Sequence, residues 1–242
     1  MDESRKTGAG LGRRVFLKIA MWTAVLAAIP KWVWAVFVEK LQVRTVESDT
    51  FRFDPGTGII RWTDQKREEP YYLTIDGLVE KPVKLSYSDL KALPQITQTS
   101  DFHCVEGWSV KDIRWGGFRF SELLKKVKVK PESRYAVFHS LGKTGSRAGG
   151  LDHYVESFSI EELLDATKER MLALTMNGQP LPHDHGAPLR VVCPHDLGYK
   201  GSKFVTRVEF SRERQQGWWT LANPVYPPEA PVPKDRLRKK KG

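Results

Sequence analysis

Short runs in which apolar and polar residues alternate recur along the chain after residue 70. The first spans Tyr71 to Val79 and ends at turn residues, as a half-buried strand does. The same pattern predicts strands at 96–104, 134–139, 171–175, 189–193 and 203–210. Strands therefore dominate the predicted secondary structure.

Short helices are predicted between some of these strands. Ser86 with Asp89, and Ser159 with Glu162, have the spacing of a capping box, in which two side chains bond free backbone N–H groups at a helix start. Residues 121–127 form a third short helical candidate. No long helix is expected after residue 70.

Turns rich in glycine and proline separate the predicted elements. Asn177-Gly178 is a strong tight-turn signal between two extended stretches. Residues 115–118 (Trp-Gly-Gly-Phe) are predicted to form another turn. Many short strands, few short helices and numerous turns indicate an α+β, strand-rich fold with mixed sheets.

The N-terminal residues carry a different pattern. Residues 13–18 (Arg-Arg-Val-Phe-Leu-Lys) lead into an apolar run, which is typical of a twin-arginine export signal. Between residues 19 and 38 only Lys31 is charged, and about 20 apolar residues suffice to cross a bilayer. Residues 1–40 are thus predicted to direct export to the periplasm, either as a cleaved signal or as a membrane anchor. A basic amphipathic helix is the alternative, but the run has no polar face.

The chain divides into four predicted regions. Residues 1–40 are the signal or anchor, and residues 41–70 are polar and predicted to be a loose connecting segment. Residues 71–222 form the main domain. Residues 223–242 are rich in proline and end in basic residues, so this tail is predicted to be extended and mobile.

The net charge of +10 comes almost entirely from the two ends of the chain. Residues 1–40 hold seven basic and three acidic residues, and residues 234–242 hold six and one, which gives +4 and +5. The 193 residues between them carry the remaining +1. A basic surface that follows nucleic-acid phosphates is therefore not expected.

All six histidines and both cysteines lie between residues 103 and 195, and residues 103–108 (His-Cys-Val-Glu-Gly-Trp) open this region. A thiolate at Cys104 would be a soft ligand for a soft metal. The alternatives are a buried, inert cysteine or a disulfide with Cys193. A zinc site built from these cysteines with His183 and His185 is a further alternative, but it lacks the close paired spacing of structural zinc modules.

A second group of residues could hold an anion. Lys200 to Lys203 (Lys-Gly-Ser-Lys) offers two ammonium groups, a hydroxyl and an open glycine backbone, and Arg190 adds a planar guanidinium. These groups together could bind a phosphate. A solvated surface loop is the alternative, because exposed lysines often have no partner.

Four motifs, in order, resemble those of the molybdopterin-binding oxidoreductases of the sulfite oxidase type. They are residues 102–108, residues 115–118, residues 176–190 with the pattern Asn-Gly-x-Pro-Leu-Pro-x-x-His-Gly-x-Pro-Leu-Arg, and residues 198–203. The resemblance covers residues 70–215. It implies a mixed, strand-rich fold that encloses one molybdopterin, with molybdenum held by the pterin dithiolene and one protein thiolate.

The resemblance also implies roles for individual residues. Cys104 matches the family's metal ligand. The positions that match contacts to the pterin or to its phosphate are Ser140, His185, Arg190, Gly201, Ser202 and Lys203.

Two subgroups of this family compete as the best match. Sulfite oxidases usually place an arginine soon after the ligand cysteine, whereas Glu106 stands here. A carboxylate in a low-dielectric pocket would repel sulfite. The Cys-Val-Glu-Gly-Trp and Gly-Tyr-Lys-Gly-Ser-Lys motifs are instead similar to the periplasmic methionine sulfoxide reductase catalytic subunit and its relatives, although His185 replaces that enzyme's asparagine.

The expected reaction is two-electron oxygen-atom transfer, namely reduction of an S-oxide or a related neutral oxo substrate. Tyr199 or His139 is expected to bond the transferred oxygen. Electrons would come from a membrane haem or quinone protein. The chain ends about thirty residues after the last predicted strand, too short for a sulfite oxidase dimerisation domain, so a monomer is expected. Alternatives are sulfite oxidation, a non-catalytic molybdopterin-bearing electron-transfer subunit, or a structural exported domain.

Overall fold

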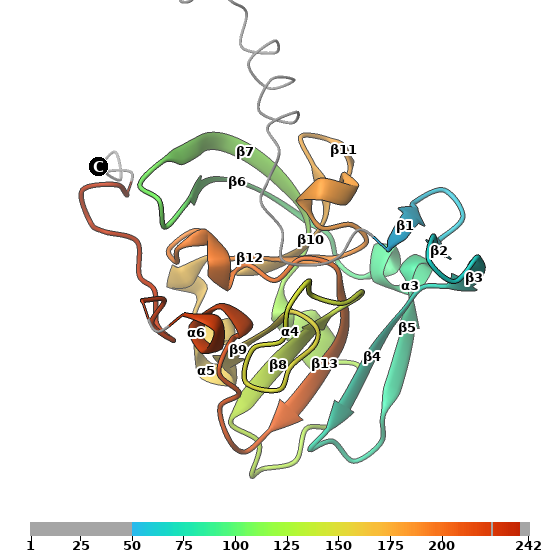
Figure 1. The fold of residues 1–242 in the computed structure, drawn as a ribbon. Coiled ribbons are helices and arrows are strands. Elements are labelled where there is room, and N and C mark those ends of the chain that lie inside the picture. Colours follow the sequence, from blue (N-terminus) through green and yellow to red (C-terminus); the bar gives the residue numbers. More distant parts are fainter. Residues whose placement is uncertain (1–49, 224, 238–242) are drawn as a thin grey trace, which may run out of the picture. The chain divides into compact units, whose positions relative to one another are not determined.

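The computed structural model describes residues 50–223 and 225–237, which belong to one compact unit (Figure 1). The predicted export signal or anchor at 1–40 lies outside the described residues. Within the described part of the chain, no helix is long and apolar enough to cross a membrane.

One of the two five-stranded sheets is a mixed sheet with the strand order β5-β4-β13-β8-β9. Its strands are β4 (Tyr72–Gly77), β5 (Val83–Ser86), β8 (Tyr135–Ser140), β9 (Val155–Ser159) and β13 (Val205–Ser211). Strand β13 runs parallel to β4, and the other neighbours are antiparallel. The predicted mixed sheet is therefore present.

The second sheet has the order β11-β10-β7-β6, with β12 paired to β10. Its strands are β6 (Ile96–His103), β7 (Ser109–Phe118), β10 (Met171–Met176), β11 (Gln179–Pro180) and β12 (Arg190–Val192). Strands β6 and β7 form a long hairpin that projects from the core (Figure 1). Cys104 lies in the loop of this hairpin.

Residues 115–118 are not a turn, as the sequence pattern predicted, but the end of strand β7. Their glycines serve packing between strands. A Cβ atom on Gly117 would lie 2.8 Å from the Cα atom of Ala173 on β10, closer than real Cβ atoms approach. Only glycine lets the two backbones come so near.

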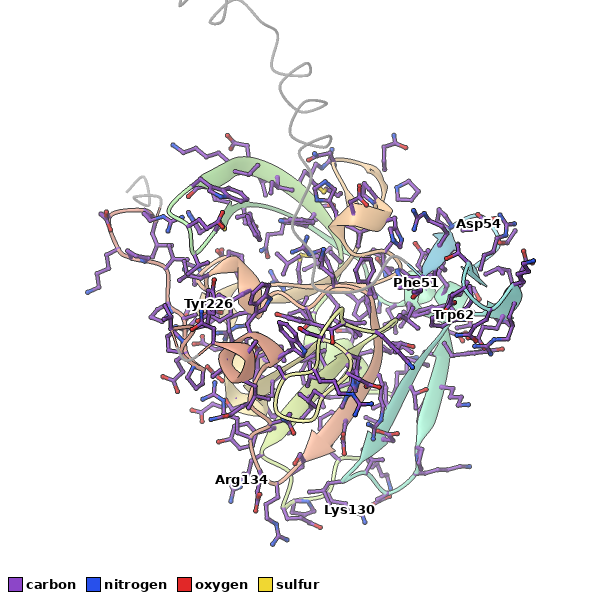
Figure 2. All side chains as sticks on the ribbon, viewed as in Figure 1. Phe51, Asp54, Trp62, Lys130, Arg134 and Tyr226 are labelled. Atoms are coloured by element: carbon purple, nitrogen blue, oxygen red, sulfur yellow. The ribbon has the colours of Figure 1, made fainter. Side chains whose placement is uncertain are left out.

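Residues 51–70, predicted to be a loose connecting segment, form a three-stranded antiparallel sheet. It consists of β1 (Phe51–Asp54), β2 (Ile59–Trp62) and β3 (Arg67–Pro70). Phe51 is 1% exposed and packs 5.3 Å from the ring of Phe204 and 5.6 Å from that of Trp62 (Figure 2). These side chains join the small sheet to the main core.

The helices are short, as predicted. They are α3 (Tyr87–Ala92), α4 (Phe120–Leu124), α5 (Ile160–Leu164), α6 (Trp218–Ala222), and the 3-10 turns η1 (Ala166–Lys168), η2 (His183–His185) and η3 (Gly198–Lys200). Both predicted capping boxes form, with Ser86 and Asp89 at α3 and Ser159 and Glu162 at α5.

One hydrophobic core joins the two larger sheets. Leu73, Phe138 and Phe210 come from the mixed sheet, and Phe118 and Leu172 come from the second sheet. All five are at most 1% exposed. Burial of apolar side chains from both sheets in a single cluster fixes the position of one sheet against the other.

The described part of the C-terminal tail is extended, but it is packed against the protein rather than mobile. The amide of Leu197 donates to the carbonyl of Ala230 at 2.8 Å, and the amide of Val232 donates to the carbonyl of His195 at 2.9 Å. Ala230 and Val232 are 3% and 4% exposed. Backbone pairing and buried side chains therefore hold this segment in place.

Candidate molybdopterin site

Cys104 lies at the start of a tight turn between β6 and β7. Its amide donates to the carbonyl of Trp108 at 2.9 Å, and the amide of Gly107 donates to the carbonyl of Cys104 at 3.2 Å. Gly107 has φ of 97°, a left-handed conformation that glycine adopts without strain. Next to the turn, the ring of His103 bonds the hydroxyl of Ser109 at 2.8 Å. The turn thus holds a half-buried thiol in a defined place.

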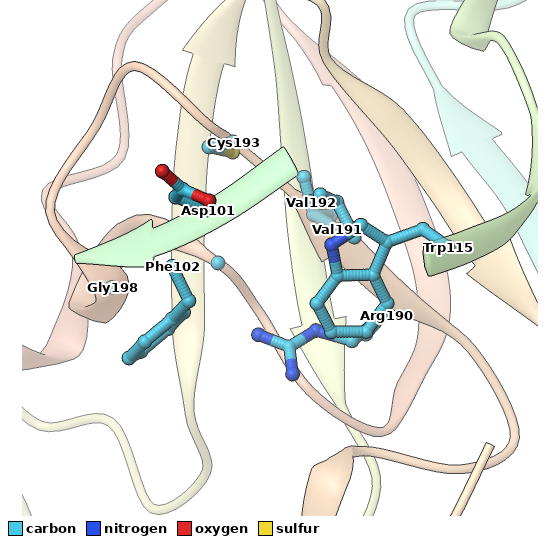
Figure 3. A pocket seen from close by; sticks show the side chains of 9 residues that line it. Asp101, Phe102, Trp115, Arg190, Val191, Val192, Cys193 and Gly198 are labelled. Atoms are coloured by element: carbon cyan, nitrogen blue, oxygen red, sulfur yellow. The ribbon is translucent and has the colours of Figure 1, made fainter. Parts of the chain in front are cut away.

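A small pocket, partly open to solvent, lies beside this hairpin (Figure 3). The residues that line it are Asp101, Phe102, Trp115, Arg190, Val191, Val192, Cys193, Gly198 and Gly201. Strands β6 and β7, strand β12 and the turn around η3 all contribute to its wall. Phe102, two residues before Cys104, therefore connects the cysteine turn with the predicted anion-binding residues.

Arg190 brings a positive charge into this pocket. Its guanidinium lies 4.9 Å from the ring centre of Trp115, and one terminal nitrogen donates to the carbonyl of His185 at 3.0 Å (Figure 3). The residue is 5% exposed, and burial lowers its pKa to about 10. No carboxylate of the described residues forms an ion pair with it, and its buried Nε atom has no hydrogen-bond partner.

The other residues implied by the family resemblance gather next to Arg190. The hydroxyl of Ser140 donates to the carbonyl of Lys203 at 2.5 Å, and the ammonium of Lys203 donates to the carbonyl of Asp184 at 3.2 Å. Ser202 is fully buried, and its hydroxyl has no hydrogen-bond partner among the described residues. The structure thus brings together residues from β8, η2, β12 and the segment after η3.

A pterin with a phosphate fits these residues. A buried guanidinium without a carboxylate and a buried hydroxyl without a partner are unfavourable unless a further group binds them. Gly201 lines the pocket with its backbone alone. A Cβ atom there would lie 3.0 Å from the carbonyl of Val191 and 3.4 Å from Arg190. An anion that accepts hydrogen bonds satisfies both donors, and the thiol of Cys104 suits a soft metal.

Lys200 does not belong to this cluster, although the sequence suggested it as a second ammonium for the anion. Its Nζ atom is 2.5 Å from a carboxylate oxygen of Glu156 and 2.7 Å from the carbonyl of Pro228. Both side chains of this ion pair are at most 3% exposed. Burial raises the pKa of Glu156, and Lys200 offsets part of that rise. A buried ammonium needs such a partner, and Glu156 was missed because it lies 44 residues away in sequence.

Tyr199 and His139, the residues expected to bond the transferred oxygen, have other partners in the structure. The hydroxyl of Tyr199 donates to the carbonyl of Pro227 at 2.7 Å, and burial raises its pKa to about 12. The ring of His139 lies 3.0 Å from both His153 and Glu209. Burial, followed by Arg207 and His153, lowers the pKa of His139 to about 4, so the ring is neutral at pH 7.

The alternative zinc site is wrong for the described residues. No group of three or more His, Cys, Asp or Glu side chains among them could hold a metal ion. Both cysteines are free, so the alternative disulfide between Cys104 and Cys193 is not present either. Cys193 packs against the main core, and burial raises the pKa of its thiol to about 12.

Glu106 does not lie in the low-dielectric pocket that the sequence argument assumed. Its side chain is exposed at the tip of the hairpin, where the indole N–H of Trp108 donates to it at 3.2 Å. Water screens an exposed carboxylate, so its repulsion of an anion is weak. Glu106 alone therefore argues little against sulfite.

Comparisons with known proteins identify relatives for this arrangement. Residues 61–219 match the family described as oxidoreductase molybdopterin binding domain. The uncharacterized oxidoreductase YuiH of Bacillus subtilis (strain 168) is 34% identical over 157 residues, which are 62% of this chain and 73% of that protein. The protein-methionine-sulfoxide reductase catalytic subunit MsrP of Ralstonia nicotianae is 32% identical over 184 residues, or 74% of this chain and 54% of that protein.

A solved structure also resembles the chain. The crystal structure of the sulfane dehydrogenase SoxCD from Paracoccus pantotrophus matches with a TM-score of 0.52 and 25% identity. The match covers 74% of this chain and 50% of that one. The chain therefore spans about half the length of MsrP and of the SoxCD chain.

Proposed function

Because the chain belongs to the oxidoreductase molybdopterin binding domain family, which includes the sulfite oxidase type, we propose that it catalyses two-electron oxygen-atom transfer. The protein is a molybdopterin-dependent oxidoreductase with molybdenum as its metal. The proposed direction is reduction of an S-oxide or a related neutral oxo substrate. The observation that carries the proposal is a pocket lined by the buried Arg190 and by Phe102, two residues before Cys104. Beside it, the Nε atom of Arg190 and the hydroxyl of Ser202 have no hydrogen-bond partner among the described residues.

Cys104 is the proposed metal ligand. Bound molybdenum would supply the exchange of an oxygen atom and two electrons with the substrate. The chain itself positions the ligand, because the hydrogen bonds between Cys104, Gly107 and Trp108 hold the cysteine in the loop of the β6–β7 hairpin. A half-buried thiol is accessible, so Cys104 would hold the metal of a bound cofactor through its sulfur.

Arg190, Ser202 and Lys203 are the proposed anchors of the cofactor phosphate, with Gly201 as the close wall. The buried charge of Arg190 and the unpaired hydroxyl of Ser202 support this assignment. His185 and Ser140 are proposed to support the pterin from η2 and β8. Their backbone and side-chain bonds to Arg190 and Lys203 hold the anchors in place.

The substrate class is proposed from the surface around Cys104 and from the relatives. Val105 and Trp108 on the same turn are 37% and 46% exposed, so an apolar surface flanks the thiol. Such a surface suits a sulfoxide that carries an organic group better than a small hydrated anion. The name of MsrP states that it acts on protein methionine sulfoxide. Sulfite oxidation is the alternative reaction.

Export and an electron partner are further parts of the proposal. The twin-arginine pattern at residues 13–18 supports export to the periplasm, with or without retention as a membrane tether. A separate membrane haem or quinone protein would supply electrons. The name of MsrP, a catalytic subunit, is in keeping with a partner of this kind.

The experiment that tests the proposal measures molybdenum and pterin in purified protein and then turnover with methionine sulfoxide, an N-oxide and sulfite. We expect about one molybdenum per chain and reduction of the S-oxide. Cys104→Ser should abolish turnover with little change in thermal stability, while the control Lys130→Ala, at an exposed residue outside the pocket lining, should keep both metal and turnover. Full activity of Cys104→Ser, or protein without molybdenum, would contradict the proposal. Molybdenum without turnover of any oxo compound would favour a non-catalytic subunit.

A further inference from the structure

The C-terminal segment from Tyr226 to Arg236 contacts both the turn around η3 and the turn that carries Cys104. It accepts the hydroxyl of Tyr199 at the carbonyl of Pro227 and the ammonium of Lys200 at the carbonyl of Pro228, each at 2.7 Å. It then pairs with the backbone of residues 195–197. Both contacts anchor the segment beside the turn that carries Gly201.

At Arg236, the segment contacts the turn that carries Cys104. One terminal guanidinium nitrogen of Arg236 lies 2.7 Å from the carbonyl oxygen of Trp108, 3.0 Å from that of Cys104 and 3.1 Å from the hydroxyl of Ser109. The amide of Arg236 donates to the carbonyl of Pro233 at 2.9 Å, which curls the backbone toward the hairpin. No carboxylate of the described residues forms an ion pair with Arg236.

We propose that Arg236 is a positioning residue for the metal ligand Cys104. This rests on the proposed role of Cys104 as that ligand. The carbonyls of Cys104 and Trp108 already close the turn by accepting the amides of Gly107 and Cys104, and Arg236 binds the same two oxygens. A charge-assisted bond to both oxygens opposes opening of the turn.

The rest of the segment makes this clamp effective. The buried side chains of Ala230 and Val232 hold the backbone only a few residues before Arg236. The arginine is therefore presented to the turn by an already ordered segment, so less conformational entropy is lost when its bonds form. Its positive charge also lies beside the peptide groups next to the sulfur.

The variants that test this are Arg236→Ala, Arg236→Lys and the matched control Lys234→Ala. Lys234 is an exposed cation of the same segment, two residues away. The first measurement is amide hydrogen exchange in the turn of full-length protein, where the amides of Cys104 and Gly107 report opening. Loss of a charge-assisted bond should speed their exchange by about tenfold to a hundredfold in Arg236→Ala. Arg236→Lys should restore part of the protection, and Lys234→Ala should match the wild type.

The second measurement is the electron paramagnetic resonance spectrum of the Mo(V) state of the holoprotein. A turn that holds its sulfur loosely should change the signal in Arg236→Ala, with partial recovery in Arg236→Lys. Unchanged exchange in Arg236→Ala, an equal change in Lys234→Ala, or faster exchange with an unchanged Mo(V) signal would each overturn the proposal. If Arg236→Ala does not fold, the comparison of Arg236→Lys with the wild type decides by the same criteria.

The two measurements separate this inference from the proposed function. Hydrogen exchange is measured with or without molybdenum, so it tests the clamp directly. Protein that contains no molybdenum would defeat the proposed function even where the clamp is present. Metal-loaded, active protein whose turn is indifferent to Arg236 would defeat only the role of Arg236.

Discussion

Arg190 carries a charge into the protein interior without a carboxylate partner among the described residues. Burial of an ion costs free energy unless an opposite charge compensates it. The lowered pKa of about 10 reflects this cost. Such a group destabilises the cofactor-free protein and is compensated when an anion binds.

Arg190→Met separates these two effects. Methionine keeps the unbranched shape and can pack on Trp115, but it removes the charge. We expect at least a tenfold loss of bound molybdopterin, because a charge-assisted contact is lost. The free energy of unfolding of the cofactor-free protein should stay the same or rise by about 1 kcal/mol. Denaturant titration and pterin analysis measure the two quantities.

Arg114→Met is the matched control, because Arg114 is an exposed arginine on the same strand as Trp115. It should alter neither pterin content nor stability. A cofactor-free Arg190→Met protein that is clearly less stable than the wild type would contradict the view of Arg190 as an uncompensated charge.

Individual residues of the candidate site were named where a motif carried them and stay predictions, whereas their hydrogen-bond partners could not be named from the sequence. Cys104, Arg190 and Ser202 were named from sequence, and the structure places the last two at one cluster. The pattern did not distinguish Lys200 from Lys203, although one is paired with Glu156 and the other is next to Asp184. The partner of each lysine depends on which part of the chain lies next to it in the folded protein.

At the scale of elements, the close approach of β7 and β10 explains the error at residues 115–118. Adjacent glycines are common in turns, so the local pattern predicted one. Here Gly117 faces the backbone of β10 and Gly116 faces the side chain of Thr175, which becomes visible only when the two strands are paired. Strands β1 to β3 were missed for a related reason, since each has only four residues and β3 consists of Arg-Glu-Glu-Pro.

Gly117→Ala should destabilise the protein by about 1–3 kcal/mol, because its Cβ atom would lie 2.8 Å from the Cα atom of Ala173 and force the strands apart. Urea denaturation measures the change. Gly145→Ala is the control, since a Cβ atom there has no neighbour within 4 Å, and its effect should be within about 0.5 kcal/mol. Equal stability of the two variants would contradict this account of β7.

Strands β8, β13 and β4 carry a row of charged and polar side chains across the mixed sheet. His139 on β8 lies 3.0 Å from Glu209 on β13, and Arg207 on β13 pairs with both Glu209 and Asp76. His139 is neutral at pH 7 because burial and Arg207 disfavour its charged form. As the pH falls, the unfolded chain therefore binds a proton at His139 at a higher pH than the folded protein does.

This difference predicts a loss of stability in acid. The pKa of His139 is about 4 in the folded protein against 6.5 for an ordinary histidine, so its contribution is complete above about pH 6.5 and is lost as pH falls toward 4. The loss amounts to roughly 3 kcal/mol at most. His139→Gln does not titrate, so the stability difference between wild type and variant should shrink from pH 7.5 to 4.5. His195→Gln is the control, and a pH-independent difference for His139→Gln would contradict the prediction.

At the scale of the whole molecule, the pocket lies where three separate parts of the chain meet. The β6–β7 hairpin supplies Cys104, β12 and the segment after η3 supply the residues proposed to bind the anion, and the C-terminal segment bonds to Cys104 and Lys200. The family match at residues 61–219 includes the first two parts. Strand β1 and Arg236 lie outside the matched residues.

The α+β class, the strand-rich mixed sheets and the molybdopterin-binding family could be predicted from the sequence. Strong alternation and capping boxes are local signals, so strands such as β4 and helices such as α3 and α5 were found. The docked tail could not be predicted, because proline-rich, basic composition is typical of mobile segments. Its position depends on Ala230 and Val232, two small apolar residues whose burial no local pattern indicates. The region boundaries at residues 40, 70 and 222 stay predictions.

The contacts of the C-terminal segment also set an order of events during synthesis. Residues 226–236 leave the ribosome after every residue that they touch, from Cys104 and Trp108 to Lys200. The sheets and the pocket walls can therefore form while the cysteine turn still lacks its guanidinium clamp. Until the segment docks, the carbonyls of Cys104 and Trp108 lack the bonds that Arg236 donates to them.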